Sequence, residues 1–197
     1  MRKALGLVAV AVVAIACSRG DPQGLTEPSR SEVTMAQAPR GDGVAEVTEA
    51  LRPHRNFRAH LRGREEVPPR DTPAQGEAVF GLRGNGGALD FKLTVANIRN
   101  VVAAHIHLGA RGINGPIVAF LFGPAGPGGG RTDGVLVGGT ITAADLIGPL
   151  AGHRLSALLA EMRAGNAYVN VHTDDGLDGA NTGPGDFPGG EIRGQIF

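Results

Sequence analysis

The sequence predicts an all-β domain, an antiparallel β-sandwich or flattened Greek-key barrel of about eight strands with two short inserted helices. Three observations predict this fold: short runs of alternating apolar and polar residues, turn signals between these runs, and a glycine content of 32 in 197 residues. Alternation is the main signal, because a half-buried strand turns every second side chain toward the core. A long helical bundle is excluded, since it would be poor in glycine.

Eight segments of the chain after residue 55 carry the strand pattern. The clearest follows a turn signal at residues 85–87 and alternates four apolar residues with polar ones. In chain order the expected strands are Phe57–Leu61, Glu77–Leu82, Leu89–Val95, Val101–Leu108, Ile117–Phe122, Val135–Ile141, Ala167–His172 and Glu191–Phe197. Their spacing is typical of a sandwich.

Two helical segments are expected between the sixth and seventh strands. Thr142 can cap a first turn at residues 143–145, since its hydroxyl can accept a hydrogen bond from a free backbone N–H. In the second segment four apolar residues have the spacing of one helix face, and Gly165 is well placed to end that helix. The four are Leu155, Leu158, Leu159 and Met162.

The first 55 residues predict an export signal and a tether. Residues 1–17 start with two basic residues, continue with an apolar run too short to span a bilayer, and end at the single cysteine, Cys17. The last four of these residues resemble a bacterial lipoprotein processing site, at which Cys17 would be lipidated; the alternative is an ordinary secretion signal with a chance cysteine. Residues 18–55 are polar and interrupted by prolines, which predicts a flexible tether before a folded domain at 56–197. We therefore expect export to the cell envelope and a lipid anchor in a membrane.

The composition excludes several classes of function. Lys+Arg 19 and Asp+Glu 19 give zero net charge, so there is no basic surface for a nucleic-acid backbone. One cysteine excludes an intrachain disulfide and a cysteine-rich zinc site. The Gly-x-Ser-x-Gly motif of a nucleophile elbow is absent from the sequence. Catalytic machinery is therefore not evident, and a binding or structural module is the expectation.

Three of the expected strands combine an apolar face with a polar face. Side chains two residues apart on a strand share a face and lie about 7 Å apart. The polar faces carry His105 and His107 in the first of these strands, Tyr168, Asn170 and His172 in the second, and Glu191, Arg193 and Gln195 in the third. If the strands are neighbours in the sheet, these side chains form one cluster.

One interpretation of this cluster is a metal site. Neutral imidazoles bind both zinc and copper, and a His-x-His pair with a third histidine supplies three of them. The ligands would be His105, His107 and His172, with Glu191 as the fourth. The protein would then store metal or carry out redox chemistry.

The other interpretation is a buried hydrogen-bond network that fixes the register of the sheet without a metal. In this network His172 would bond to Asn170 or Glu191, and Arg193 would pair with Glu191. The polar cluster of Tyr168, Asn170 and Arg193 belongs to either interpretation. The sequence alone leaves both open.

Acidic residues occur at two further places. A glycine-rich segment, 174–189, contains four aspartates that could hold calcium through oxygen ligands, although their spacing does not fit an EF-hand. These are Asp174, Asp175, Asp178 and Asp186. A solvated acidic loop is the alternative that we favour at this point. Glu65 and Glu66 precede two prolines and predict a solvated turn.

Six motifs occur in order along the folded part of the chain. They are Leu61–Gly63, Glu66–Pro69, His105–Gly109 with Gly112 and Gly115–Pro116, Thr142–Leu146, Arg163–Thr173 and Gly190–Gln195. With these motifs the chain resembles the CHRD domain family, named after chordin, from about Phe57 to Phe197. The family usually has a short loop where this chain has 174–189.

The resemblance implies an extracytoplasmic all-β domain, in the form of a bacterial single-domain secreted protein or lipoprotein. It brings no enzymatic activity with it. It also gives no reason to assume the growth-factor partner of the animal protein. We therefore expect an unidentified extracytoplasmic protein or glycan as partner, and no nucleic acid.

Overall fold

The computed structural model describes residues 55–177 and 182–197, so that the expected leader and nearly all of the expected tether lie outside the described residues. The strands are β1 (Asn56–Arg62), β2 (Gln75–Leu82), β3 (Leu89–Arg99), β4 (Val101–Leu108), β5 (Ile117–Phe122), β6 (Arg131–Ile141), β7 (Ala167–Thr173) and β8 (Ile192–Gln195). The helical elements are η1 (Gly63–Glu65), η2 (Ala143–Asp145), η3 (Gly148–Leu150) and α2 (Leu155–Arg163).

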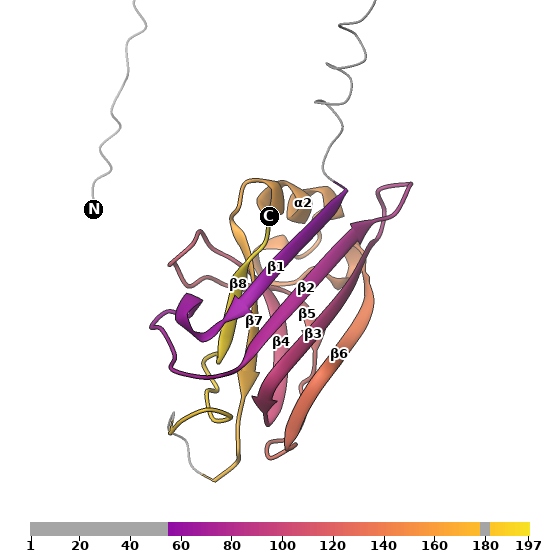
Figure 1. Cartoon of the computed structure of the whole chain (residues 1–197). Coiled ribbons are helices and arrows are strands. Elements are labelled where there is room, and N and C mark those ends of the chain that lie inside the picture. Colours follow the sequence, from indigo (N-terminus) through magenta and orange to yellow (C-terminus); the bar gives the residue numbers. More distant parts are fainter. Residues whose placement is uncertain (1–54, 178–181) are drawn as a thin grey trace, which may run out of the picture. The chain divides into compact units, whose positions relative to one another are not determined.

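The eight strands form one antiparallel sheet that curves until it is nearly a closed barrel (Figure 1). Their order is β5-β4-β7-β8-β1-β2-β3-β6, and the two end strands, β5 and β6, approach each other. α2 lies at one end of the barrel, next to β7 (Figure 1). The predicted all-β class with few short helices is confirmed.

The interior of the barrel is apolar because each strand turns alternate side chains inward. On β1 the burial pattern alternates strictly between exposed and buried residues. Leu61, Leu93 and Ile106 are fully buried in the resulting core. The hydrophobic core thus accounts for the inward face of the sheet, while β7 and β8 are buried on both faces.

The two expected helical segments both form. The hydroxyl of Thr142 accepts from the backbone N–H of Ala144, and Asp145 accepts in return from the N–H of Thr142, although the element they cap is a short 3₁₀ helix. α2 buries all four apolar residues of its expected face. Gly165, whose φ is 70°, follows the last turn in the left-handed conformation that favours glycine.

β6 is longer than expected, and β8 is shorter. β6 starts at Arg131 because its pairing with β3 continues past two irregularities in register as far as Arg99. β8 is confined to Ile192–Gln195, so Glu191, Ile196 and Phe197, which were expected to belong to it, lie outside the strand. Within the described ranges, no helix is sufficiently long and apolar to cross a membrane.

Candidate functional site

β4, β7 and β8 are neighbours in the sheet, and their outward faces are polar. Such a face normally contacts water, yet here His105, His107 and Asn170 are no more than 8% exposed and Arg193 is 1% exposed. The connections β1–β2, β4–β5 and β7–β8 supply the contacts that cover this face. We call the covered residues the outer polar cluster: His105, His107, Tyr168, Asn170, His172 and Arg193.

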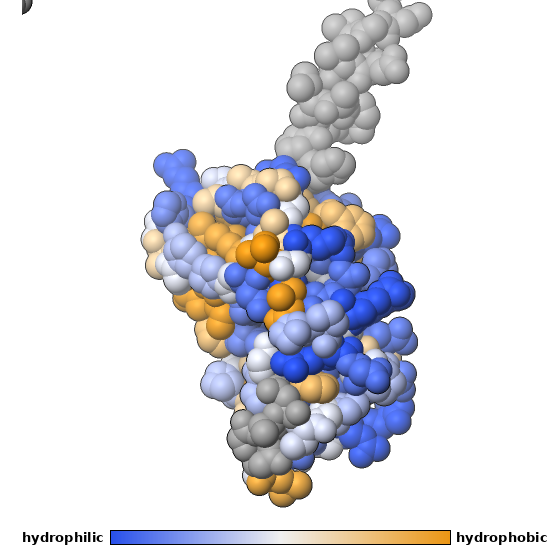
Figure 2. Space-filling model, turned by 90° about the vertical axis from the view of Figure 1, so that its left-hand side faces the viewer, coloured by the Kyte–Doolittle hydropathy of each residue, from blue (hydrophilic) through white to orange (hydrophobic). Residues whose placement is uncertain are grey.

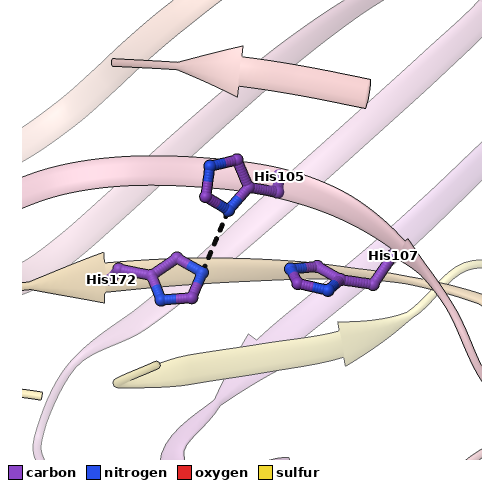
Figure 3. Close-up of side chains that lie close together, drawn as sticks. All are labelled: His105, His107 and His172. Carbon is purple, nitrogen blue, oxygen red and sulfur yellow. Dashed lines mark hydrogen bonds between the residues drawn. The ribbon is translucent and has the colours of Figure 1, made fainter. Parts of the chain in front are cut away.

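The three histidines of the outer polar cluster converge (Figure 3). β4 and β7 pair so that His105 lies opposite Asn170 and His107 opposite Tyr168, and His172 follows one pair further along the same face. The Nδ1 of His105 and the Nε2 of His172 are 3.1 Å apart. One ring nitrogen from each of the three histidines lies within 4.8 Å of the other two.

Backbone carbonyls hold two of the rings in a defined tautomer. The Nδ1 of His107 lies 2.9 Å from the carbonyl oxygen of Gly115, and the Nδ1 of His172 lies 2.9 Å from that of Pro188. A carbonyl oxygen can only accept, so Nδ1 carries the proton in both rings and Nε2 keeps a lone pair. The Nε2 of His107 is buried and has no hydrogen-bond partner among the residues that the structure describes.

The imidazoles of this site are neutral at neutral pH. Burial and the nearby His172 together lower the pKa of both His105 and His107 to about 4, against the opposing effect of the Gly115 carbonyl on His107. Burial also lowers the pKa of His172, against the opposing effect of the Pro188 carbonyl. Neutral imidazole is the form that binds metal ions.

Aromatic rings fix the orientation of the histidines. Tyr168 stacks on His107 with ring centroids 4.9 Å apart, and Phe120 meets His105 edge-on at 4.6 Å. The hydroxyl of Tyr168 accepts from the N–H of Gly115 at 3.0 Å, which joins the covering loop to β7. The site is therefore built from packed side chains and one anchored loop.

Arg193 fastens the β4–β5 loop to β8. Its guanidinium donates to the side chain of Asn114 and to the carbonyl oxygens of Ala110 and Ile113, at 2.9–3.1 Å. It also lies over the ring of Tyr168, 3.5 Å from the centroid. The pairing of Arg193 with Glu191, which the network interpretation expected, does not form between these two described residues.

Glu191 lies elsewhere, and the structure does not bring it to the histidines. It precedes β8, is fully buried, and accepts from the hydroxyls of Thr72 and Thr173 and from the N–H of Gly185 at 2.5–2.9 Å. The hydrogen bond expected between His172 and Asn170 or Glu191 is likewise replaced by contacts with His105 and Pro188. A buried polar network does exist, but it has other partners.

Glu66 belongs to this region, and the expectation of a solvated turn is wrong for it. Its side chain is 4% exposed, and its Oε2 accepts from the amide of Asn170 at 3.4 Å. Burial raises the pKa of Glu66 to about 7, although Arg193 and Arg70 act to lower it. Asn170 stands 104 residues away in the sequence, so local sequence could not reveal this contact. Glu65 does lie near the surface, where it pairs with Arg111.

The remaining candidate residues lie away from the histidines or outside the described residues. Carboxylate oxygens of Asp174, Asp175 and Asp186 lie within 4.8 Å of one another in the β7–β8 connection. Cys17 and Asp178 lie outside the described residues. Gln195 extends the polar face of β8 by donating to the carbonyl oxygens of residues 109, 165 and 167.

Comparison with known proteins identifies the barrel as one family domain. The model of the CHRD domain matches residues 57–196, which is more than two thirds of the chain. This range contains the eight strands, the three histidines and the loops that cover them. Neither a curated protein nor a solved structure matches the chain.

Proposed function

The chain belongs to the CHRD domain family, and from this premise we propose that its barrel is a binding module that holds a zinc or copper ion between His105, His107 and His172. One observation carries the proposal. Two backbone carbonyls accept hydrogen bonds from the Nδ1–H groups of His107 and His172. The Nε2 atom of each ring therefore carries the lone pair and can act as a metal ligand. Donation of the second ring N–H to a carbonyl is the usual way in which proteins orient a metal-binding histidine.

The distance between His105 and His172 fits this proposal. In a tetrahedral zinc site with Zn–N bonds of 2.0–2.1 Å, two ligand nitrogens lie about 3.3 Å apart. The Nδ1 of His105 and the Nε2 of His172 are 3.1 Å apart. In the metal-free protein the Nδ1–H of His105 would donate a hydrogen bond to Nε2 of His172. Metal binding at Nδ1 would require the other tautomer of His105, with the proton on Nε2.

Binding, rather than catalysis, is the role that we assign to this ion. Three protein ligands leave one tetrahedral position for water or for a group from a partner. On the face shown in Figure 2 the apolar residues form separate patches among hydrophilic ones. The open coordination position is therefore the most specific binding feature that the histidine site offers.

The experiment compares metal binding by the chain from Ser18 to Phe197, stripped with a chelator, with binding by a His105→Ala/His172→Ala variant. We expect one equivalent of zinc or copper in the parent protein and none in the variant at micromolar metal. His153→Ala is the matched control, because His153 is an exposed histidine outside the cluster. A parent protein without bound metal, or a double variant that binds equally well, would contradict the proposal.

The second part of the proposal is that the protein is exported and tethered to a membrane through lipid on Cys17. The leader-like residues 1–17 and the family's extracytoplasmic members support it. A Cys17→Ser variant is expected to move from the membrane fraction to the soluble fraction of the producing cells, with the barrel unchanged. Equal membrane association of both proteins would argue against a lipid at Cys17.

A further inference from the structure

The connection between β7 and β8 contains an acidic cluster separate from the histidines. Asp174 and Asp175 come directly after β7, and Asp186 returns to them from the far side of the connection. One carboxylate oxygen from each residue lies within 4.8 Å of the other two. Acidic residues often cluster without a ligand, but the surroundings of Asp186 distinguish this cluster.

Asp186 is a buried carboxylate with an unpartnered oxygen. The residue is only 2% exposed, and its Oδ2 accepts from both the N–H and the hydroxyl of Thr182, at 2.9 and 2.7 Å. Its Oδ1 is also buried and lacks a well-formed hydrogen bond among the residues that the structure describes, although the backbone N–H of Asp175 lies close enough to the carboxylate to help lower its pKa. A buried acceptor without a partner is rare in folded proteins and usually indicates an unseen water or ion.

The charge of the cluster points to a cation rather than to water. Both hydrogen bonds from Thr182 are donated to Oδ2 of Asp186, as suits a carboxylate anion. Other aspartates of the domain, Asp90 and Asp133, form ion pairs with arginines. In the β7–β8 connection three carboxylates instead share a space of a few ångströms.

We propose that Asp174, Asp175 and Asp186 bind a calcium ion. Calcium takes six to eight oxygen ligands at 2.3–2.6 Å, so oxygens on opposite sides of one ion lie about 4.8 Å apart. The three carboxylates fit within that diameter. Magnesium dehydrates reluctantly and usually keeps several waters beside one or two carboxylates, so a group of three carboxylates suits calcium better.

The ligand chemistry separates this site from the histidine site. Carboxylate oxygens are hard ligands that suit calcium, whereas the imidazoles of the outer polar cluster suit zinc or copper. The two sites nevertheless share the β7–β8 connection, because the carbonyl of Pro188 holds His172. Calcium at the aspartates would therefore restrain the loop that orients one histidine, but its binding does not depend on the metal proposed above.

Calorimetric titration of calcium chloride into the chelator-stripped chain from Ser18 to Phe197 tests this proposal. We expect one equivalent to bind, with a Kd of about 10⁻⁴–10⁻³ M, the range of extracellular modules. Asp175→Asn and Asp186→Asn should each weaken binding by roughly tenfold or more, since each removes a charged ligand. The His105→Ala/His172→Ala variant should bind calcium as the parent protein does, which separates this result from that for zinc.

Asp71→Asn is the matched control, because Asp71 is an exposed aspartate outside the cluster. If Asp186→Asn fails to fold, Asp175→Asn still tests calcium binding, because Asp175 is only half-buried and its substitution should leave the fold intact. The proposal would be overturned if the parent protein showed no saturable calcium binding up to roughly 10 mM. It would also be overturned if the parent protein and Asp175→Asn bound calcium with equal affinity.

Discussion

Glu66→Gln is expected to stabilise the barrel at pH 8 by about 3 kcal/mol relative to the wild-type protein and to change its stability little at pH 4. Burial raises the pKa of Glu66 from 4.5 to about 7, and each pKa unit corresponds to about 1.4 kcal/mol. Glutamine has nearly the same shape, has no charge to bury, and can donate to Asn170, whose Oδ1 has no partner among the described residues. Urea unfolding at several pH values, with a chelator present, would measure the effect.

The sign follows from proton binding in the two states. Below pH 4.5 Glu66 is protonated in both the folded and the unfolded chain, and its contribution to stability is fully present. Between pH 4.5 and about 7 the unfolded chain releases the proton while the folded chain keeps it, so the free energy of unfolding falls as pH rises. Above about pH 7 the loss is complete.

Glu77→Gln is the control for net charge, because it removes one negative charge from an exposed position on β2. The quantity to compare is the difference in unfolding free energy between each variant and the wild type, since this difference cancels the titration of the other groups. A difference for Glu66→Gln that stays constant from pH 4 to pH 8 would show that Glu66 is not buried as a protonated acid.

The strands were predictable because their pattern depends on local physics. Alternating burial on the two faces of a strand requires alternating side chains, and β1, which alternates strictly, extends only one residue beyond each end of the predicted Phe57–Leu61. The ends of β4 and β5 were also predicted correctly, although their burial does not alternate. The extra length of β6 was not predictable, since Arg131 and Thr132 join the strand only through their pairing with Arg99 and Ile98 of β3. Strand order is a tertiary property and is not contained in the alternation.

The histidine cluster was predictable only in part. Because alternate residues of a strand share a face, His105 and His107 were expected together on one strand and His172 on the polar face of another. Their contact, however, requires β4 and β7 to be neighbours. The acceptors that orient the rings are backbone carbonyls of Gly115 and Pro188, and a carbonyl has no signature in the sequence.

Glu191 and Glu66 illustrate the same limit for carboxylates. Alternation extrapolated from β8 placed Glu191 beside the histidines, but the strand begins only at Ile192, and the residue before it faces Thr72 and Thr173 instead. Glu66 reaches the polar cluster because the β1–β2 connection folds over β7. Residues that enter a site from covering loops are invisible to strand periodicity.

Gly115→Ala is expected to weaken zinc binding roughly 10–100-fold, the usual effect of losing the group that orients a metal-binding histidine. A β-carbon at Gly115 would lie only 1.5 Å from the carbonyl oxygen of Leu108. The contacted oxygen belongs to the backbone and cannot swing aside as a side chain could, so the loop itself must move. Its movement would withdraw the carbonyl that accepts from Nδ1 of His107 and the N–H that donates to Tyr168.

Two measurements separate this orienting role from a general loss of structure. Competition titration with a zinc chelator gives the affinity, and the ¹⁵N shifts of the His107 ring report which nitrogen carries the proton. Gly126→Ala is the matched control, since a β-carbon there meets no atom within 4 Å. In Gly115→Ala, but not in Gly126→Ala, we expect both neutral tautomers of His107 to be populated and the free energy of unfolding to fall by about 1–3 kcal/mol. Unchanged zinc affinity despite a mixed tautomer would mean that the Gly115 carbonyl packs the loop without orienting a ligand.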